Sequence, residues 1–232
     1  MEIIRGKIPQ PYKIVIYGVP GIGKSTLAAK ASKPLFLDLE GGVSRIDADK
    51  TPRLETWESV LEAMRFAFQA KEYETIIIDT LDALEEIIRK HVCKANNWKS
   101  IEQAGYGKGY IVMLETLQNF LDICDKMNKN VILIGHEQIK AFASPDSDSY
   151  DRYFLKMHQK LAGVVVARAD AVLFAQYETM VKSDKSSESR LRAIGTGKRV
   201  LRTQETPAYI AKNRFNLEQT IEMNPTVFEK LI

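Results

Sequence analysis

The segment GVPGIGKST, residues 18–26, constrains the fold of this chain more than any other feature. It fits the pattern G-x-x-x-x-G-K-[ST], in which Gly23, Lys24 and Ser25 hold three of the fixed positions. An apolar run precedes the segment and a helical pattern follows it, so we expect a buried strand, a glycine-rich loop and a helix in that order. Backbone N–H groups in such a loop, together with the helix N-terminus, bind phosphate oxygens. A structural glycine-rich turn is the alternative interpretation.

The loop residues have distinct predicted roles in binding ATP. Lys24 is expected to reach the β- and γ-phosphates, and the hydroxyl of Ser25 is expected to bind Mg²⁺. A second part of the site is expected from TIIIDT, residues 75–80, where Asp79 ends an apolar run. Its carboxylate can hold the water shell of the Mg²⁺ ion, as the Walker-B acid does in P-loop enzymes. The predicted nucleotide-binding residues are Gly18, Val19, Pro20, Gly21, Ile22, Gly23, Lys24, Ser25 and Thr26.

Hydrolysis also needs a group that orients or deprotonates the attacking water, and the Walker-B acid is followed by Thr80 rather than by a glutamate. The segment LFLDLEGG, residues 35–42, offers that group, because Glu40 lies just beyond a predicted strand end. The C-terminal ends of strands gather on the ligand side of an open α/β sheet. Glu40 is therefore the predicted catalytic base, and Asp38 is expected to support the strand end. The alternatives are an exposed turn residue at Glu40 and, as the base, Asp82 in the following helix.

Short apolar runs alternate with helical patterns through most of the chain. The runs are nearly continuous and rich in β-branched or aromatic residues, which predicts buried strands over 12–17, 35–39, 75–79, 131–135 and 171–176. Apolar residues at helical spacing predict helices over 56–72, 80–95 and 110–128. This alternation is typical of a mostly parallel, doubly wound α/β sheet. Without an internal repeat or a linker, residues 1–232 are expected to form one domain.

The pattern changes after residue 176. The segments LRAIG (191–195) and RVLRT (199–203) flank the turn TGK and predict a C-terminal antiparallel hairpin. PAYIAKNRF (207–215) is expected to close the core. Polar stretches at 143–152 and 183–190 are expected to be loops.

Composition limits the class of protein. Apolar residues form 45% of the chain and charged residues 27%, the balance of a soluble globular protein. No apolar run approaches the ~18 residues of a membrane span, and the N-terminal segment lacks the apolar core of a signal peptide, so we expect a cytoplasmic protein. Cys93 and Cys124 are expected to be free thiols, and three histidines without a cysteine cluster argue against a metal site built by the protein alone. Residues 190–214 carry seven basic side chains against one acid, Glu205, and form either a solvated edge or a region that meets an anionic group.

His136 follows the predicted strand over 131–135, where it is expected to sense the γ-phosphate or to couple it to the next loop. That loop mixes aromatic and basic side chains, as does GYGKGY at 105–110. Such mixtures suit stacking on single-stranded bases with neutralisation of phosphates. A mobile loop with packed aromatic residues is the alternative for both segments. The predicted DNA contacts are Tyr106, Lys108, Arg152, Tyr153 and Lys156.

Together the P-loop, the carboxylates of FLDLEGG and a Walker-B strand without a following glutamate resemble the RecA-type ATPase core. The resemblance implies a RecA-like fold with helices on both faces of the sheet, and the catalytic glutamate of that family occupies the position of Glu40. AKNRFN, residues 211–216, is similar to the K-x-R element of RecA-fold hexamers such as DnaB and the RadA proteins. There the lysine and arginine reach the nucleotide site of the neighbouring subunit, which makes Lys212 and Arg214 candidate trans-acting fingers.

The chain is also similar to small phage-encoded RecA-core ATP-binding proteins, some of which act in single-strand annealing or recombination. This resemblance implies a Mg²⁺-dependent ATPase with active sites between the subunits of a ring or filament. It would act on single-stranded DNA in the host cytoplasm, with a phage or host single-strand-binding protein as a further partner. Two alternatives stay open. A nucleotide or metabolite kinase could use the arginine-rich segment 190–202 as a lid, and a nucleotide-gated loader would hydrolyse ATP only slowly.

Overall fold

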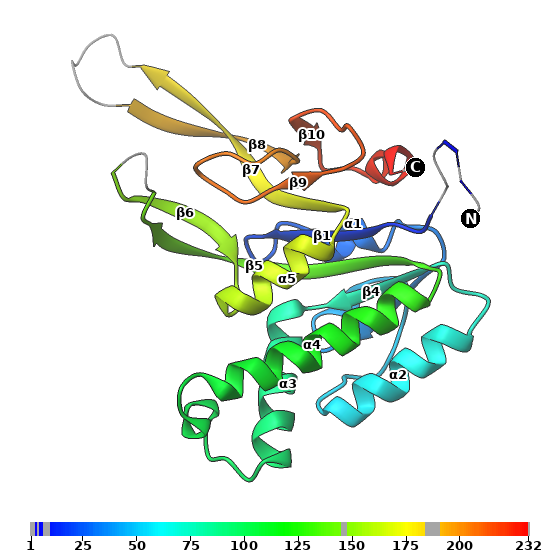
Figure 1. Cartoon of the computed structure of the whole chain (residues 1–232). Coiled ribbons are helices and arrows are strands. Elements are labelled where there is room, and N and C mark those ends of the chain that lie inside the picture. Colours follow the sequence, from blue (N-terminus) through cyan, green and yellow to red (C-terminus); the bar gives the residue numbers. More distant parts are fainter. Residues whose placement is uncertain (1–2, 4, 7–9, 145–147, 184–190, 232) are drawn as a thin grey trace.

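The computed structural model describes residues 3, 5–6, 10–144, 148–183 and 191–231 (Figure 1). Its strands are β1 Lys13–Gly18, β2 Pro34–Asp38, β3 Asp49–Lys50, β4 Thr75–Asp79, β5 Asn130–Phe142, β6 Tyr150–Leu155, β7 Ala171–Ser183, β8 Leu191–Arg202, β9 Lys212–Asn213 and β10 Thr220–Glu222. They form one sheet in the order β10-β8-β7-β1-β5-β4-β2-β3, with β6 paired to β5 and β9 paired to β7. Strands β7, β1, β5, β4, β2 and β3 run parallel, whereas β6, β8, β9 and β10 pair antiparallel to their neighbours. The predicted α/β fold, with a mostly parallel sheet, is confirmed.

The helices follow the strands much as the apolar spacing predicts. They are α1 Lys24–Ala28, α2 Trp57–Gln69, α3 Leu81–Ala95, α4 Lys108–Lys126 and α5 Gln159–Arg168, with short 3₁₀ turns at Val43–Arg45, Ile101–Ala104 and Pro225–Lys230. Thr56 and Ser59 form a reciprocal capping box that starts α2. Thr80 caps α3, because its hydroxyl accepts a hydrogen bond from the N–H of Ala83 at 3.4 Å. Helix α3 therefore begins immediately after the strand that carries Asp79.

The two faces of the sheet are covered unequally. On one face Val15, Tyr17 and Ile78 pack against α2, α3, α4 and α5. On the other face Ile14 and Ile16 pack against α1 and the C-terminal segment. The strands are buried on both sides, which explains why their sequences are continuous apolar runs rather than alternating ones. Helices on both faces are confirmed, although the helices beneath the sheet in Figure 1 are longer and more numerous than the single short helix on the other face.

The C-terminal strands differ in part from the prediction. The predicted C-terminal antiparallel pairing is confirmed, since β8 pairs antiparallel with β7. The predicted turn at TGK is wrong, because residues 191–202 form one continuous strand. Gly197 has a φ of 75°, and the register between β7 and β8 shifts between Tyr177 and Thr179. Gly195 and Gly197 therefore lie at an irregularity within a long strand rather than at its end. The segment 207–215 does close the core, as predicted, since Tyr209 and Ala211 are buried.

Two further loop predictions are only partly right. Residues 150–152 of the predicted loop over 143–152 belong to β6, which pairs with β5, whereas residues 143–144 and 148–149 lie outside the strands, as predicted. Ser183 belongs to β7, and residues 145–147 and 184–190 lie outside the described ranges. Figure 1 shows the hairpins β5–β6 and β7–β8 extending from the same end of the sheet. In the described ranges no helix is both long and apolar enough to cross a membrane, and Cys93 and Cys124 are free thiols.

Candidate nucleotide-binding and catalytic site

The loop between β1 and α1 has a backbone that requires glycine at fixed positions. Gly18 has a φ of 152°, and a Cβ atom at this residue would lie 2.1 Å from the carbonyl oxygen of Ala175 on the neighbouring strand. Gly23 has a φ of 101° and leads directly into Lys24, the first residue of α1. A side chain would clash at the first position and would be strained at the second. The sequence pattern thus reflects the geometry of a P-loop.

The side chain of Lys24 folds back over this loop. It is buried, and its Nζ donates hydrogen bonds to the carbonyl oxygens of Gly18 at 2.8 Å and Val19 at 3.0 Å. Burial lowers the pKa of Lys24, and nearby carboxylates, led by Glu137 and Asp79, act in the opposite direction. A lysine held in this way presents its ammonium group where phosphates bind to a P-loop.

Ser25 and Asp79 meet at the predicted Mg²⁺ position. The Ser25 hydroxyl donates a hydrogen bond of 2.5 Å to Oδ2 of Asp79, which is buried at the end of β4. Burial raises the pKa of Asp79 to about 6, the Ser25 hydrogen bond lowers it, and the carboxylates of Glu40 and Asp38 raise it. Hydroxyl and carboxylate oxygens are the ligands that Mg²⁺ prefers, so the pair fits this ion.

The two acids of LFLDLEGG have separate environments. Asp38 is buried beside Asp79 in the register of β2 and β4, and its Oδ1 accepts a hydrogen bond of 2.6 Å from the N–H of Gly41. It therefore supports the strand end, as predicted. Glu40 is exposed in the turn that follows, and it acts electrostatically on both Asp79 and Lys24. The structure thus brings the predicted base to the same end of the sheet as the P-loop.

His136 lies directly beside the start of the P-loop, because its Cα pairs with that of Gly18 across β5 and β1. Its Nδ1 is 3.1 Å from both carboxylate oxygens of Asp82, in the first turn of α3. This contact makes Asp82 a partner of His136, whereas the sequence suggested it only as an alternative base. Glu137 is a second acid that the sequence reasoning missed: its Oε2 is buried and forms no hydrogen bond to the described residues. The His-Glu pair directly after an apolar strand was the available signal.

These elements together form a P-loop, the hydrogen-bonded pair of Ser25 and Asp79, and further acidic residues at one edge of a parallel sheet. A family model described as an AAA domain, AAA_24, matches residues 10–215. The chain belongs to this family. It is therefore a P-loop, AAA-type nucleotide-binding domain, and residues 18–26 are its nucleotide-binding loop.

Two known proteins are similar to this AAA domain. The SPbeta prophage-derived uncharacterized protein YorG of Bacillus subtilis (strain 168) is 26% identical over 212 residues, which cover 89% of this chain. The chain spans 60% of the length of YorG. A crystal structure of the RadB recombinase matches with a TM-score of 0.47 and 14% identity, over 90% of this chain and 85% of that one.

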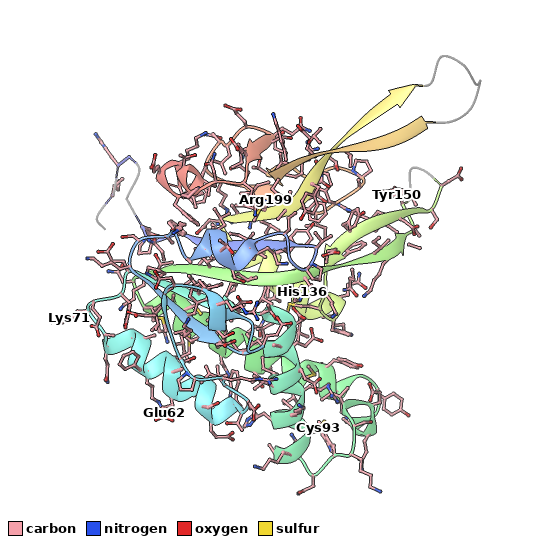
Figure 2. The ribbon with its side chains drawn as sticks, turned by 180° about the vertical axis from the view of Figure 1, so that it is seen from behind. Glu62, Lys71, Cys93, His136, Tyr150 and Arg199 are labelled. Atoms are coloured by element: carbon pink, nitrogen blue, oxygen red, sulfur yellow. The ribbon has the colours of Figure 1, made fainter. Side chains whose placement is uncertain are left out.

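The P-loop of the AAA domain also contacts the basic C-terminal region. Arg199 on β8, labelled in Figure 2, donates a hydrogen bond of 3.2 Å from Nη1 to the carbonyl oxygen of Ile22. The same nitrogen lies 2.7 Å from where a Cβ atom would project at Gly23. The excess of basic residues in 190–214 was a signal for this contact, but the sequence could not show which residue reaches the loop.

The predicted DNA contacts divide into buried and exposed side chains. Arg152 is only 8% exposed; its Nη2 donates to the carbonyl oxygens of Thr206 and Tyr209 at 3.2 Å each, and it forms an ion pair with Glu205. Its guanidinium also lies over the rings of Phe142 and Phe154, at 5.2 and 5.7 Å. Arg152 is therefore a structural residue of the β5–β6 hairpin rather than the exposed cation that the predicted DNA contact requires. Its Nη2 is bonded inside the chain, and its Nε is buried without a hydrogen-bond partner among the described residues.

Tyr153 is half-buried and packs against Phe174, with ring centroids 5.0 Å apart. Lys156, by contrast, has a 58% exposed side chain, and its Nζ is 3.9 Å from Asp82. Tyr106 and Lys108 are exposed at the N-terminus of α4. The cations of this set that a strand of DNA can reach are thus Lys156 and Lys108.

Lys212 and Arg214 do not contact the P-loop of their own chain. Lys212 Nζ donates to the carbonyl oxygens of Val166 and Ala167, at 3.0 and 2.7 Å, near the C-terminus of α5. Arg214 Nη1 pairs with Oδ1 of Asp170 at 3.1 Å, beside the start of β1 rather than its P-loop end. An effect on a nucleotide site would therefore require a neighbouring subunit, and the trans-acting role stays a prediction.

Proposed function

We propose that this AAA domain is a Mg²⁺-dependent ATPase. The observation that carries the proposal is the 2.5 Å pair between Ser25 and Asp79, next to Lys24 at the mouth of the P-loop. A hydroxyl and a carboxylate in this position would hold Mg²⁺ on the β- and γ-phosphates, and the Lys24 ammonium group would neutralise charge on the same phosphates. Bound Mg²⁺ would supply charge stabilisation for phosphoryl transfer.

Glu40 supports hydrolysis rather than binding alone. Its carboxylate is exposed, and therefore accessible to water, at the edge of the sheet where Asp79 ends β4. In this role Glu40 accepts a proton from the attacking water, and His136 contacts the terminal phosphate from β5. A slow, nucleotide-gated loader would keep the same binding residues but would not depend on Glu40 for its biological effect.

The experiment measures phosphate release by the full chain with Mg²⁺ and ATP. We expect Lys24→Ala to lose nucleotide binding, whereas Glu40→Gln should bind nucleotide normally and lose hydrolysis by a factor of about 10²–10⁴. Glu62→Gln, which removes an exposed acid on α2, is the matched control and should hydrolyse ATP normally. Normal hydrolysis by Glu40→Gln would show that the base lies elsewhere, and phosphate transfer to a small acceptor would favour the kinase alternative.

We further propose that the domain acts on single-stranded DNA as an oligomer, in a phage recombination or annealing reaction. Lys140 on β5 and Lys156 just after β6 are exposed on the β5–β6 hairpin. The base of this hairpin lies next to the nucleotide site, where His136 and Lys156 both contact Asp82. Exposed lysines next to aromatic side chains suit a single strand. Phosphate release at several protein concentrations, with and without single-stranded DNA, tests this directly. Turnover that responds to neither variable would contradict it.

A further inference from the structure

The pair formed by Asp82 and His136 is the most sharply defined polar contact near the P-loop that the proposed function does not explain. Both oxygens of the Asp82 carboxylate are 3.1 Å from Nδ1 of His136. A carboxylate only accepts hydrogen bonds, so Nδ1 carries a hydrogen in this arrangement. The Nε2 atom is therefore the ring nitrogen left for another partner, and no described residue forms a hydrogen bond to it.

His136 and Asp82 lie close to the P-loop and largely out of water. The side chains of His136 and Asp82 are only 15% and 19% exposed, so water screens their interaction weakly. His136 lies beside Gly18, where the P-loop begins (Figure 2). Lys156, just beyond the end of β6, is 3.9 Å from Asp82, and Glu85 on α3 also interacts with Asp82 electrostatically. Asp82 acts in turn on Lys24 of the P-loop, together with Glu137 on β5 and Asp79 on β4.

We propose that His136 takes up a proton when a nucleoside triphosphate binds, and that Asp82 is the positioning residue that makes this possible. The inference rests on the proposed nucleotide site. In the bound state the ring lies between two anions: Nδ1–H donates to Asp82, and Nε2, protonated from solvent, donates to the terminal phosphate. Each anion favours the charged form of the imidazole, so the two act together.

This arrangement distinguishes triphosphates from diphosphates. A diphosphate lacks the terminal group that would accept the bond from Nε2, so it brings only the Asp82 contact and takes up fewer protons. The imidazole ring thus gains its positive charge when the triphosphate binds and loses it when hydrolysis leaves the diphosphate. Asp82 contacts the imidazole and not the nucleotide, so it acts through His136 as a positioning residue.

Calorimetry on the full chain tests the inference. A non-hydrolysable ATP analogue with Mg²⁺ is titrated near neutral pH in two buffers of different ionisation enthalpy, which gives the number of protons taken up for each nucleotide bound. We expect the wild type to take up more protons than His136→Gln with the analogue, and the difference to disappear with ADP. Asp82→Asn keeps an oxygen that can accept from Nδ1–H but removes the charge, so it should weaken analogue binding about tenfold and leave ADP binding within about twofold.

Glu86→Gln is the matched control, because Glu86 lies one turn further along α3 and pairs with Arg89 at the surface. It should bind and take up protons like the wild type. Since the chain has three histidines, nitrogen NMR of their rings gives an independent readout on the wild type alone: one ring should be Nδ1-protonated when empty and doubly protonated with the analogue. Analogue binding with equal proton uptake in wild type and His136→Gln would overturn the inference and leave the proposed ATPase standing. Absence of any nucleotide binding that depends on Lys24 would overturn both.

Discussion

Asp79 allows a quantitative test of how the site is built, because its carboxylate is buried close to other acids. Its pKa rises from the ordinary 3.8 to about 6, mainly through burial, with Glu40 and Asp38 adding to the rise and Ser25 opposing it. An acid with a raised pKa is more stable in its neutral form in the folded chain than in the unfolded chain. Ionised Asp79 therefore costs the folded state about 3 kcal/mol at neutral pH, when no cation compensates the charge.

Replacing Asp79 by asparagine removes the charge and keeps an oxygen that can accept the hydrogen bond from Ser25. Without nucleotide or Mg²⁺, we expect Asp79→Asn to raise the free energy of unfolding by roughly 1–3 kcal/mol above about pH 7. The gain should shrink as pH falls through about 6 and vanish below about pH 4, where the wild-type acid is protonated in both the folded and unfolded states. Urea unfolding followed by circular dichroism at several pH values in this range measures the effect.

The surface variant Glu62→Gln controls for the loss of one negative charge, and its free energy of unfolding should follow the wild type at every pH. The Asp79→Asn variant should also lose Mg²⁺-dependent nucleotide binding, so that greater stability accompanies lower function. Equal pH dependence of unfolding for Asp79→Asn and wild type would refute the argument that an uncompensated charge is buried at this position. A destabilised variant at high pH would refute it as well.

Three further outcomes are expected. Arg152→Ala should lower the free energy of unfolding by roughly 2–4 kcal/mol, because it removes two hydrogen bonds to the carbonyl oxygens of Thr206 and Tyr209 together with the packing of the guanidinium over Phe142 and Phe154. In urea titrations Lys156→Ala should stay within about 0.5 kcal/mol of the wild type. Arg199→Ala should weaken nucleotide binding several-fold in calorimetry, since its contact with the P-loop is lost, whereas the adjacent exposed Lys198→Ala should not; equal affinities would show that the contact does not support binding. In mixtures of inactive Lys24→Ala and Arg214→Ala chains, ATPase activity should recover if Arg214 serves a neighbouring site, and no recovery at any ratio would contradict the trans role.

The sequence predicts well those features that depend on local geometry. The P-loop is predictable because the backbone conformation of the loop requires glycine at fixed positions. The strand ending in Asp79 is predictable because a strand buried on both faces of a sheet has a continuous apolar sequence. The strand β8 was misread, because a glycine at a positive φ occurs in a turn and also at an irregularity within a long strand, and Gly197 alone does not distinguish them. Arg152 shows the other limit: burial of an arginine depends on carbonyl groups more than 50 residues away, at Thr206 and Tyr209, which no local pattern encodes.

The contact between His136 and Asp82 was out of reach for a related reason. His136 lies within β5 and Asp82 in the first turn of α3, and 54 residues separate them in the sequence. Only the order of strands brings them together, because β5 lies between β1 and β4 in the sheet and α3 begins where β4 ends. Sequence reasoning therefore places such residues at one edge of the sheet but does not show which of them pair.

The electrostatics of this edge support the proposal that the nucleotide arrives with its metal ion. Four carboxylates, those of Glu137, Asp79, Asp82 and Glu40, act on Lys24, the buried lysine of the P-loop. A free nucleotide would bring its negative phosphates to a region that already has an excess of acids, and the single ammonium group would not balance them. A nucleotide bound to Mg²⁺ places a divalent cation next to Ser25 and Asp79 and its phosphates next to Lys24, so each charge meets one of opposite sign. The burial of Asp79 that destabilises the empty domain is therefore the same feature that favours the metal-bound ligand.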